Sequence, residues 1–184
     1  MSEFFNALRD EDISFIHEQP MFFTATACAD GRINLSPKGG DGMHRVVNPN
    51  LFCYLDMTGS GNETSAHITN DGRITIMFNS YTRNPLILRL YGHGRVAQPG
   101  SPEYEEHIGL FPDKVGRRQI VFVDIDQTQT TCGFAVPHME LKSHRDTLDR
   151  WADQKGREEV LEYQQDRNRL SIDGMDTGLT KRTL

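Results

Sequence analysis

The chain has 184 residues, of which 36% are hydrophobic and 25% charged, as is typical of one globular domain with a substantial core. The net charge of −6 and the lack of a basic stripe argue against a general nucleic-acid-binding protein. The N-terminus does not resemble a signal peptide, no apolar run is long enough to span a membrane, and the three cysteines form no CxxC pair. We therefore expect a cytoplasmic protein with reduced thiols, no metal site and no membrane or nucleic-acid partner.

Six segments have the alternating or β-branched pattern that is typical of strands, and short turns such as Ala29-Asp30-Gly31 join several of them. These segments span residues 22–28, 32–36, 51–56, 73–78, 86–97 and 119–125. Meander connections between so many short strands favour a closed antiparallel barrel over a βαβ fold.

Three segments favour helices, at residues 10–19, 101–110 and 143–170, and Gly156 is a candidate break in the last. The last segment has a sparse apolar stripe, made by Leu148, Trp151, Val160 and Leu161. Because this stripe is too sparse for an independent core, we expect a barrel domain with an N-terminal helix at 1–142 and, at 143–184, a helical extension packed on it. The tail from residue 171 has no periodicity, so its end is expected to be disordered or to hold a partner subunit.

The most informative segment is residues 50–68, where an apolar strand leads into a small polar loop, Thr58–Ser65, and then into a helical pattern. The start of a helix offers free backbone N–H groups and the positive end of the helix dipole, a combination that suits phosphate. From the residues alone, an ordinary loop with Asn62 or Thr64 as the helix N-cap is an equally good interpretation.

Five segments, taken in order, resemble the FMN-binding split-barrel proteins of the pyridoxamine 5′-phosphate oxidase type. They are FFTATACADGRINLSPKG, LFCYLDMTGSGNETSAHI, RITIMF, LRLYGHGRV and TTCGFAVPHMEL. No single segment is diagnostic, but their order and spacing are jointly specific. The resemblance implies a mainly β fold with flanking helices, a six-stranded antiparallel split β-barrel that forms a homodimer and holds FMN at the subunit interface.

The resemblance also implies which residues contact the cofactor. The phosphate would lie just after the third strand, Lys38 matches a family lysine at the end of the second strand, and Leu55, Asp56 and Met57 would pass the flavin ring. Lys38 and Arg83 could donate charge-assisted hydrogen bonds to the phosphate, although Lys38 also suits a solvated loop and Arg83 a turn. The expected cofactor-binding residues are Ser36, Pro37, Lys38, Leu55, Asp56, Met57, Gly61, Asn62, Glu63, Thr64, Ser65 and Arg83.

The chain departs from the family pattern at two places. The oxidase holds the cofactor phosphate with a Ser-Arg-Lys type of segment, whereas this chain has Asn62-Glu63-Thr64, in which Glu63 should face away from a phosphate. The oxidase also has an Arg-x-His element near its C-terminus that holds its substrate, and residues 174–184 contain none. The resemblance therefore supports a flavin site more strongly than it supports oxidation of pyridoxamine phosphate.

Two functions remain open at this point. The first is an FMN-dependent oxidoreductase with an unknown small substrate, and the second is a non-catalytic carrier of a flavin, a deazaflavin or haem. The sequence contains no GxSxG motif or catalytic dyad, and His67 and His138 are the histidines with the best prospect of approaching a cofactor or substrate. An aromatic face with Phe22, Phe23 and Phe134 is the expected homodimer contact.

Overall fold

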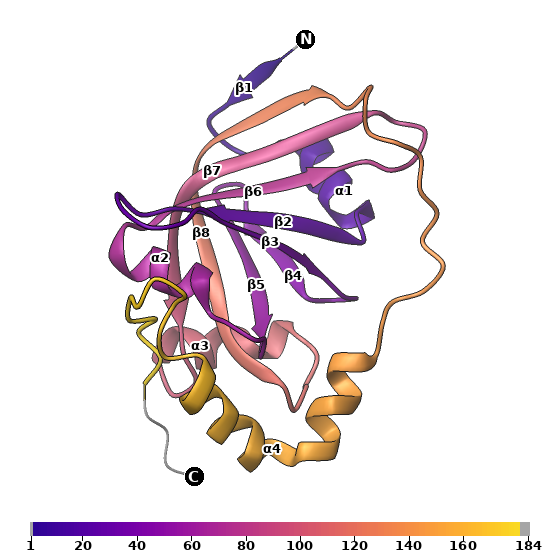
Figure 1. Ribbon diagram of the computed structural model, residues 1–184. Coiled ribbons are helices and arrows are strands. Elements are labelled where there is room, and N and C mark those ends of the chain that lie inside the picture. The colour runs from indigo at the N-terminus through magenta and orange to yellow at the C-terminus, as the bar shows by residue number, and fades with distance from the viewer. Residues whose placement is uncertain (1, 181–184) are drawn as a thin grey trace.

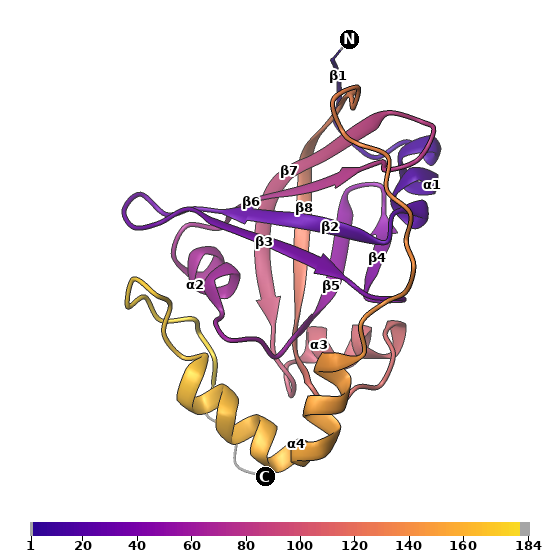
Figure 2. The same ribbon diagram turned by 45° about the vertical axis from the view of Figure 1, so that its right-hand side comes forward.

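The computed structural model describes residues 2–180, which form one strongly curled antiparallel sheet with helices around its edges (Figures 1 and 2). Its strands run in the order β3-β2-β6-β7-β8-β5-β4, and β1 pairs with β8. The strands are β1 Glu3–Phe5, β2 Met21–Thr26, β3 Asn34–Gly39, β4 His44–Asn48, β5 Leu51–Met57, β6 Arg73–Asn79, β7 Leu86–Ala97 and β8 Arg117–Cys132. The helices are α1 Asp10–Glu18, α2 Glu63–Asn70, α3 Pro102–His107 with the 3-10 turn η1 Ile108–Leu110, and α4 Thr147–Arg167.

All six predicted strands are present, but the predicted number is wrong because the structure adds β1 and β4. β1 has three residues and pairs with β8, and β4 is a five-residue strand at the edge of the sheet beside β5. Such short segments lack the long alternation that marks a strand in a sequence. β8 continues to Cys132 rather than Ile125, because its polar second half pairs with β7 and β1.

The inside of the curled sheet is filled by an aromatic cluster. The ring of Phe22 on β2 packs against those of Phe52, Tyr54 and Phe78 at centroid distances of 5.2–5.5 Å. Edge-to-face and tilted contacts at this separation are favourable for aromatic rings. Because Phe22 is 1% exposed, the prediction that it belongs to an exposed dimer face is wrong.

The opposite face of β5 is buried as well. Cys53 and Leu55 alternate with Phe52 and Tyr54 along the strand, and they join a second apolar cluster with Tyr104 of α3. Successive side chains of a strand point to opposite faces of its sheet, so β5 is held between two packed layers. The end of β5 is therefore a rigid platform.

Helix α4 crosses one open end of the curled sheet (Figures 1 and 2). It bends at Gly156, whose φ is 76°, which confirms the predicted break. Its buried residues are Ala152, Val160 and Gln164, so only Val160 of the predicted apolar stripe is buried. None of the helices between residues 2 and 180 has the length and hydrophobicity that a membrane-spanning helix needs.

The tail after α4 folds back beside α2, in the yellow segment of Figures 1 and 2. Ser65 Oγ donates to the carbonyl of Thr177 at 2.7 Å, and the backbone N–H of Arg32 donates to Asp173 at 2.7 Å. The tail is thereby fixed to α2 and to the β2–β3 turn. The expectation about the end of the tail concerns residues 181–184, which lie outside the described part of the chain.

Candidate cofactor site

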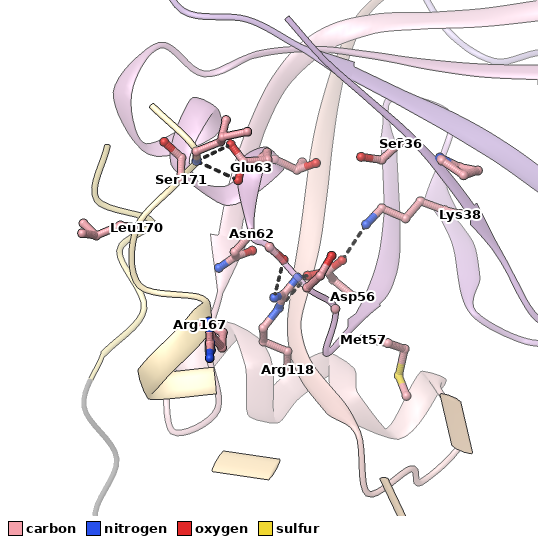
Figure 3. Close-up of a pocket in the computed structure, with 16 residues that line it drawn as sticks. Ser36, Lys38, Asp56, Met57, Asn62, Glu63, Arg118, Arg167, Leu170 and Ser171 are labelled. Atoms are coloured by element: carbon pink, nitrogen blue, oxygen red, sulfur yellow. Dashed lines mark hydrogen bonds and ion pairs between the residues drawn. The ribbon is translucent and has the colours of Figure 1, made fainter. Parts of the chain in front are cut away.

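A cavity of about 670 Å³ lies between the ends of β3 and β5, the start of α2 and the tail (Figure 3). Nine of the twelve expected cofactor residues line it, namely Ser36, Pro37, Lys38, Asp56, Met57, Gly61, Asn62, Glu63 and Thr64. Leu55 instead lines a smaller adjoining cavity, and Ser65 is buried against the tail. Arg83 lies in the β6–β7 connection and does not line either cavity.

The loop between β5 and α2 is fixed at its first residue, Thr58. The backbone N–H and the hydroxyl of Thr58 both donate to the carbonyl of Gly116 at 2.8 Å. The hydroxyl also accepts a hydrogen bond from Gln164 of α4 at 2.7 Å. Since both partners come from distant parts of the chain, the tertiary structure positions this loop.

The floor of the cavity holds a buried carboxylate between two cations. Lys38 Nζ donates to Asp56 Oδ1 at 2.9 Å, and Arg118 Nη2 donates to Asp56 Oδ2 at 2.7 Å (Figure 3). Burial alone would raise the pKa of Asp56, but the charges and hydrogen bonds of Arg118 and Lys38 outweigh it and hold this pKa well below its usual value. Asp56 is therefore ionised at neutral pH.

Arg118 joins three parts of the site and was missed by the sequence analysis. Its Nη1 donates to the carbonyl of Gly61 at 2.9 Å and to Asn168 Oδ1 at 2.7 Å. The register of β5 and β8, in which Asp56 is opposite Gln119, brings Arg118 close to Asp56. In the sequence, an arginine directly before a strongly apolar segment was the feature that could have marked Arg118 as a buried residue. Its partner, Asp56, could not be identified without the register of the two strands.

Within residues 2–180, the backbone N–H groups at the start of α2 receive no side-chain cap. Asn62 occupies the N-cap position, but its amide oxygen accepts from Gln119 Nε2 at 2.8 Å and its amide nitrogen donates to the carbonyl of Asn168 at 3.4 Å. The N-cap role that was considered for Asn62 is therefore not adopted by its side chain. The first-turn N–H groups, which have no partner within the helix, remain available to an anion.

Glu63 is oriented toward the tail. Its two carboxylate oxygens lie 3.1 and 3.2 Å from the backbone N of Ile172, which donates to them (Figure 3). The expectation was that this carboxylate faces away from a phosphate, and its contact with the tail fits that orientation, although Glu63 still lines the cavity.

Neither candidate histidine reaches the cavity. His67 is buried in α2, where its Nδ1 lies 3.1 Å from Thr26 Oγ1, and His138 is exposed in the extended segment after β8. The described residues that line the cavity include no histidine or cysteine, and residues 2–180 contain no cluster of three side chains that could hold a metal ion. The functional groups of the site are therefore ammonium, guanidinium, amide, hydroxyl and carboxylate groups.

The comparison with known proteins begins with a curated relative, because no family model matches this chain. The pyridoxamine 5′-phosphate oxidase family protein ustO of Aspergillus flavus is 35% identical to this chain over an alignment of 192 positions. The alignment covers 95% of this chain and 77% of the relative.

Solved structures show the same fold at lower identity. HupZ of Group A Streptococcus is 22% identical with a TM-score of 0.52, over 66% of this chain and 91% of HupZ. A candidate pyridoxamine 5′-phosphate oxidase of Lactobacillus delbrueckii is 19% identical with a TM-score of 0.52, over 67% of this chain and 94% of that one. The predicted antiparallel split barrel with flanking helices is thus confirmed, apart from its number of strands. With the identity and coverage of the fungal relative, the chain belongs to the pyridoxamine 5′-phosphate oxidase family.

Proposed function

We propose that the cavity binds FMN and that the protein is an FMN-dependent oxidoreductase acting on a small molecule. In this proposal the phosphate lies at the start of α2 and the ring lies along the end of β5. The observation that carries the proposal is the uncapped start of α2, which faces a cavity whose floor holds Lys38 and Arg118. Membership of the family supports a cofactor of this class.

The charges of the cavity suit a phosphate. Among the described residues that line the cavity, Lys38, Arg118 and Arg167 are basic and Asp56 and Glu63 are acidic, so the lining has an excess of basic side chains. Lys38 and Arg118 both contact Asp56, and Arg167 pairs with its exposed neighbour Asp166. A phosphate monoester carries a charge of about −1.5 to −2 at neutral pH and would compensate this excess.

The side chains of the site would hold and orient the cofactor rather than move protons. Asp56 is ionised and fully engaged with cations, so it has no proton to donate at neutral pH. Backbone groups of Leu55 and Met57 would border the ring. FMN would supply two-electron redox chemistry when bound, and the protein would control its orientation and its access to water.

A non-catalytic carrier of a flavin, a deazaflavin or haem is the second candidate. It is favoured by the lack of a histidine among the described residues that line the cavity, because a proton donor of that kind would point to turnover. Anaerobic titration of the FMN-loaded protein with NADH and NADPH distinguishes the two. Bleaching of the flavin absorbance followed by reoxidation with an acceptor supports the oxidoreductase, whereas unchanged colour supports the carrier.

The phosphate site is tested by comparing FMN with riboflavin, which lacks the phosphate. Lys38→Met combined with Thr64→Val removes a charge and a hydroxyl from the cavity wall. A hydrogen bond to a charged group contributes about 1.5–3 kcal/mol, so losing two should weaken FMN binding by roughly two to four orders of magnitude. Riboflavin should bind the variant and the wild type about equally.

The matched control is Lys114→Met, which also removes a partly buried lysine that is paired with a carboxylate, here Asp149 at 2.5 Å. Lys114 does not line the cavity, so this change should leave the preference for FMN over riboflavin intact. A double variant that keeps the wild-type preference would show that the phosphate is not bound at this place.

We further propose a homodimer that forms through the outer face of β2, β3, β6 and β7. Phe23 lies opposite Met77 in the register of β2 and β6, and both are half-buried on this face. Leu35 of the neighbouring β3 is 66% exposed, and Ile33, just before this strand, is 79% exposed. Large apolar side chains gathered on one exposed face support association with a second copy.

Light scattering at micromolar concentration tests the dimer. Leu35→Lys should shift the wild-type dimer toward a monomer, while Val47→Lys, at a 39% exposed position of β4, should not. A monomeric wild-type protein would refute the dimer without affecting the proposed phosphate site.

A further inference from the structure

A second cavity of about 230 Å³ opens beside the first one. The two share a wall that is made of Pro37, Lys38, Asp56, Met57 and Gly59. The second cavity extends from this wall toward β2, the β3–β4 turn and the first turn of α4. A ligand in the first cavity and a ligand in the second would therefore be neighbours.

The far walls of the second cavity are apolar and fixed. Phe22, Met43, Tyr54 and Leu55 contribute to them and are at most 6% exposed. Phe22 and Tyr54 pack edge to face, with ring centroids 5.3 Å apart and an interplanar angle of 69°. Such rings are held by the core, so the shape of these walls does not depend on a bound ligand.

The β3–β4 turn is built to hold Met43 against this cavity. Gly40 has a φ of +114°, and a Cβ at this position would come within 2.8 Å of Met43 Cγ. A side chain there would be strained and would also displace Met43. The backbone of the turn thus determines one wall of the cavity.

The charged groups of the second cavity lie at its shared wall, where Lys38 and Asp56 are paired. Outside that wall, the hydroxyl of Thr58 is already bonded to Gly116 and Gln164. A guest would therefore place an apolar body against Phe22, Met43 and Leu55 and a polar group near Lys38 and Asp56. An apolar cavity of about 150 Å³ holds benzene, so this larger one has room for one substituted ring.

We propose that the second cavity is the substrate pocket, and that it takes a small molecule with a single apolar ring or a short branched chain and a polar group at the mouth. This inference rests on the proposed function, because a flavin ring along the end of β5 would border both cavities. Leu148, which lines the pocket from α4 and is 39% exposed, sets its depth on the solvent side.

The test uses FMN-loaded protein, with benzyl alcohol as the probe and glycerol as the polar control. Leu148→Trp fills the pocket from a half-exposed position, while Leu161→Trp makes the same change at a partly exposed α4 residue that lines neither cavity. Ligand-observed NMR and the flavin absorbance should show that benzyl alcohol binds and glycerol does not. Leu148→Trp should weaken the binding of benzyl alcohol at least tenfold and leave the FMN affinity unchanged. Leu161→Trp should change neither affinity.

Equal binding of benzyl alcohol to the wild type and to Leu148→Trp would overturn the inference, and so would the absence of binding to the wild type. The same titrations on the protein without FMN separate this inference from the proposed function. If FMN does not bind, but benzyl alcohol binds to the wild type and not to Leu148→Trp, the flavin proposal fails and the apolar pocket remains. If FMN binds and benzyl alcohol does not, only the substrate pocket fails.

Discussion

The seven residues of strand β5 contribute to two different parts of the protein interior, one aromatic and one charged. Its first half places Phe52 and Tyr54 in an aromatic cluster, and its last residues place Asp56 between Lys38 and Arg118. Burying rings stabilises the fold directly, whereas burying charges costs desolvation that their attraction often fails to offset. The aromatic end of β5 therefore provides stability, whereas we infer that the charged end is retained for the ligand that it binds.

We expect the largest loss of stability from a substitution in the aromatic cluster. Phe52→Ala removes a fully buried ring that lines neither cavity, and such a change costs about 3–5 kcal/mol. Urea unfolding should show this loss at every pH at which the protein is folded. The ratio of FMN to riboflavin affinity should stay at the wild-type value, because the charged end is untouched.

Phe4→Ala is the control for this change, because Phe4 is 55% exposed. It should alter the free energy of unfolding by less than about 0.5 kcal/mol. A comparable loss at the two positions would contradict the assignment of stability to the aromatic cluster.

We expect the next largest loss of stability from a substitution at the charged end of β5. Asp56→Asn removes the buried carboxylate that pairs with Arg118 and Lys38, and removing one partner of a buried pair costs about 3 kcal/mol or more. The pKa of Asp56 is depressed, so its stabilisation is complete above the unfolded pKa of about 3.9 and is lost as the pH falls through the lower folded value. Stability of the wild type and variant should therefore converge in acid.

Asp149→Asn is the matched control for Asp56→Asn, since Asp149 pairs with Lys114 but is partly exposed. Its effect on unfolding should be small, as is usual for exposed pairs. A gap between wild type and Asp56→Asn that stays constant down to pH 2 would show that the ion pairs do not cause it.

His44 packs against the aromatic cluster, and its protonation should make the stability of the protein depend on pH. Burial lowers the pKa of His44 to about 4, and a backbone hydrogen bond with Ile16 only partly opposes this. Since the unfolded chain takes up the proton first, stability should fall as the pH decreases from about 6.5 to about 4. The difference of about 2.5 pKa units corresponds to roughly 3 kcal/mol at most.

His44→Phe should remove this part of the pH dependence, as measured by urea unfolding at several pH values. His93→Phe is the control, because His93 is exposed and pairs with Asp126 at the surface. An unchanged slope between pH 4 and 6.5 in His44→Phe would assign the acid sensitivity to other groups.

The smallest expected effect concerns the tail that borders the charged end. Asp173→Asn weakens the contacts of Asp173 with the backbone and the guanidinium of Arg32. The melting temperature should hardly change, because the Arg32 side chain of the pair is 69% exposed, but amide exchange of residues 171–177 should become faster. Asp166→Asn, which alters an exposed pair with Arg167 outside the tail contacts, should leave that exchange unchanged.

Local patterns in the sequence were sufficient for most of the fold. The strand at 86–97 was predicted with both ends correct, and the hairpin around Ala29-Asp30-Gly31 was found because alternation and turn residues are properties of neighbouring positions. β4 was missed because a short edge strand has no such pattern. Phe22 was assigned to the surface because its face depends on which strands lie around it.

Neighbouring residues in the sequence were enough to predict six of the eight strands, the polar loop before α2 and the resemblance to the family. Which side chains share the cavity follows only from the folded chain. Arg118 reaches Asp56 because β8 pairs with β5 in one register, and the tail is held at α2 by the hydrogen bond from Ser65 to Thr177. Such pairings join residues far apart in the chain, and their free energies depend on the burial and geometry that only the folded chain provides.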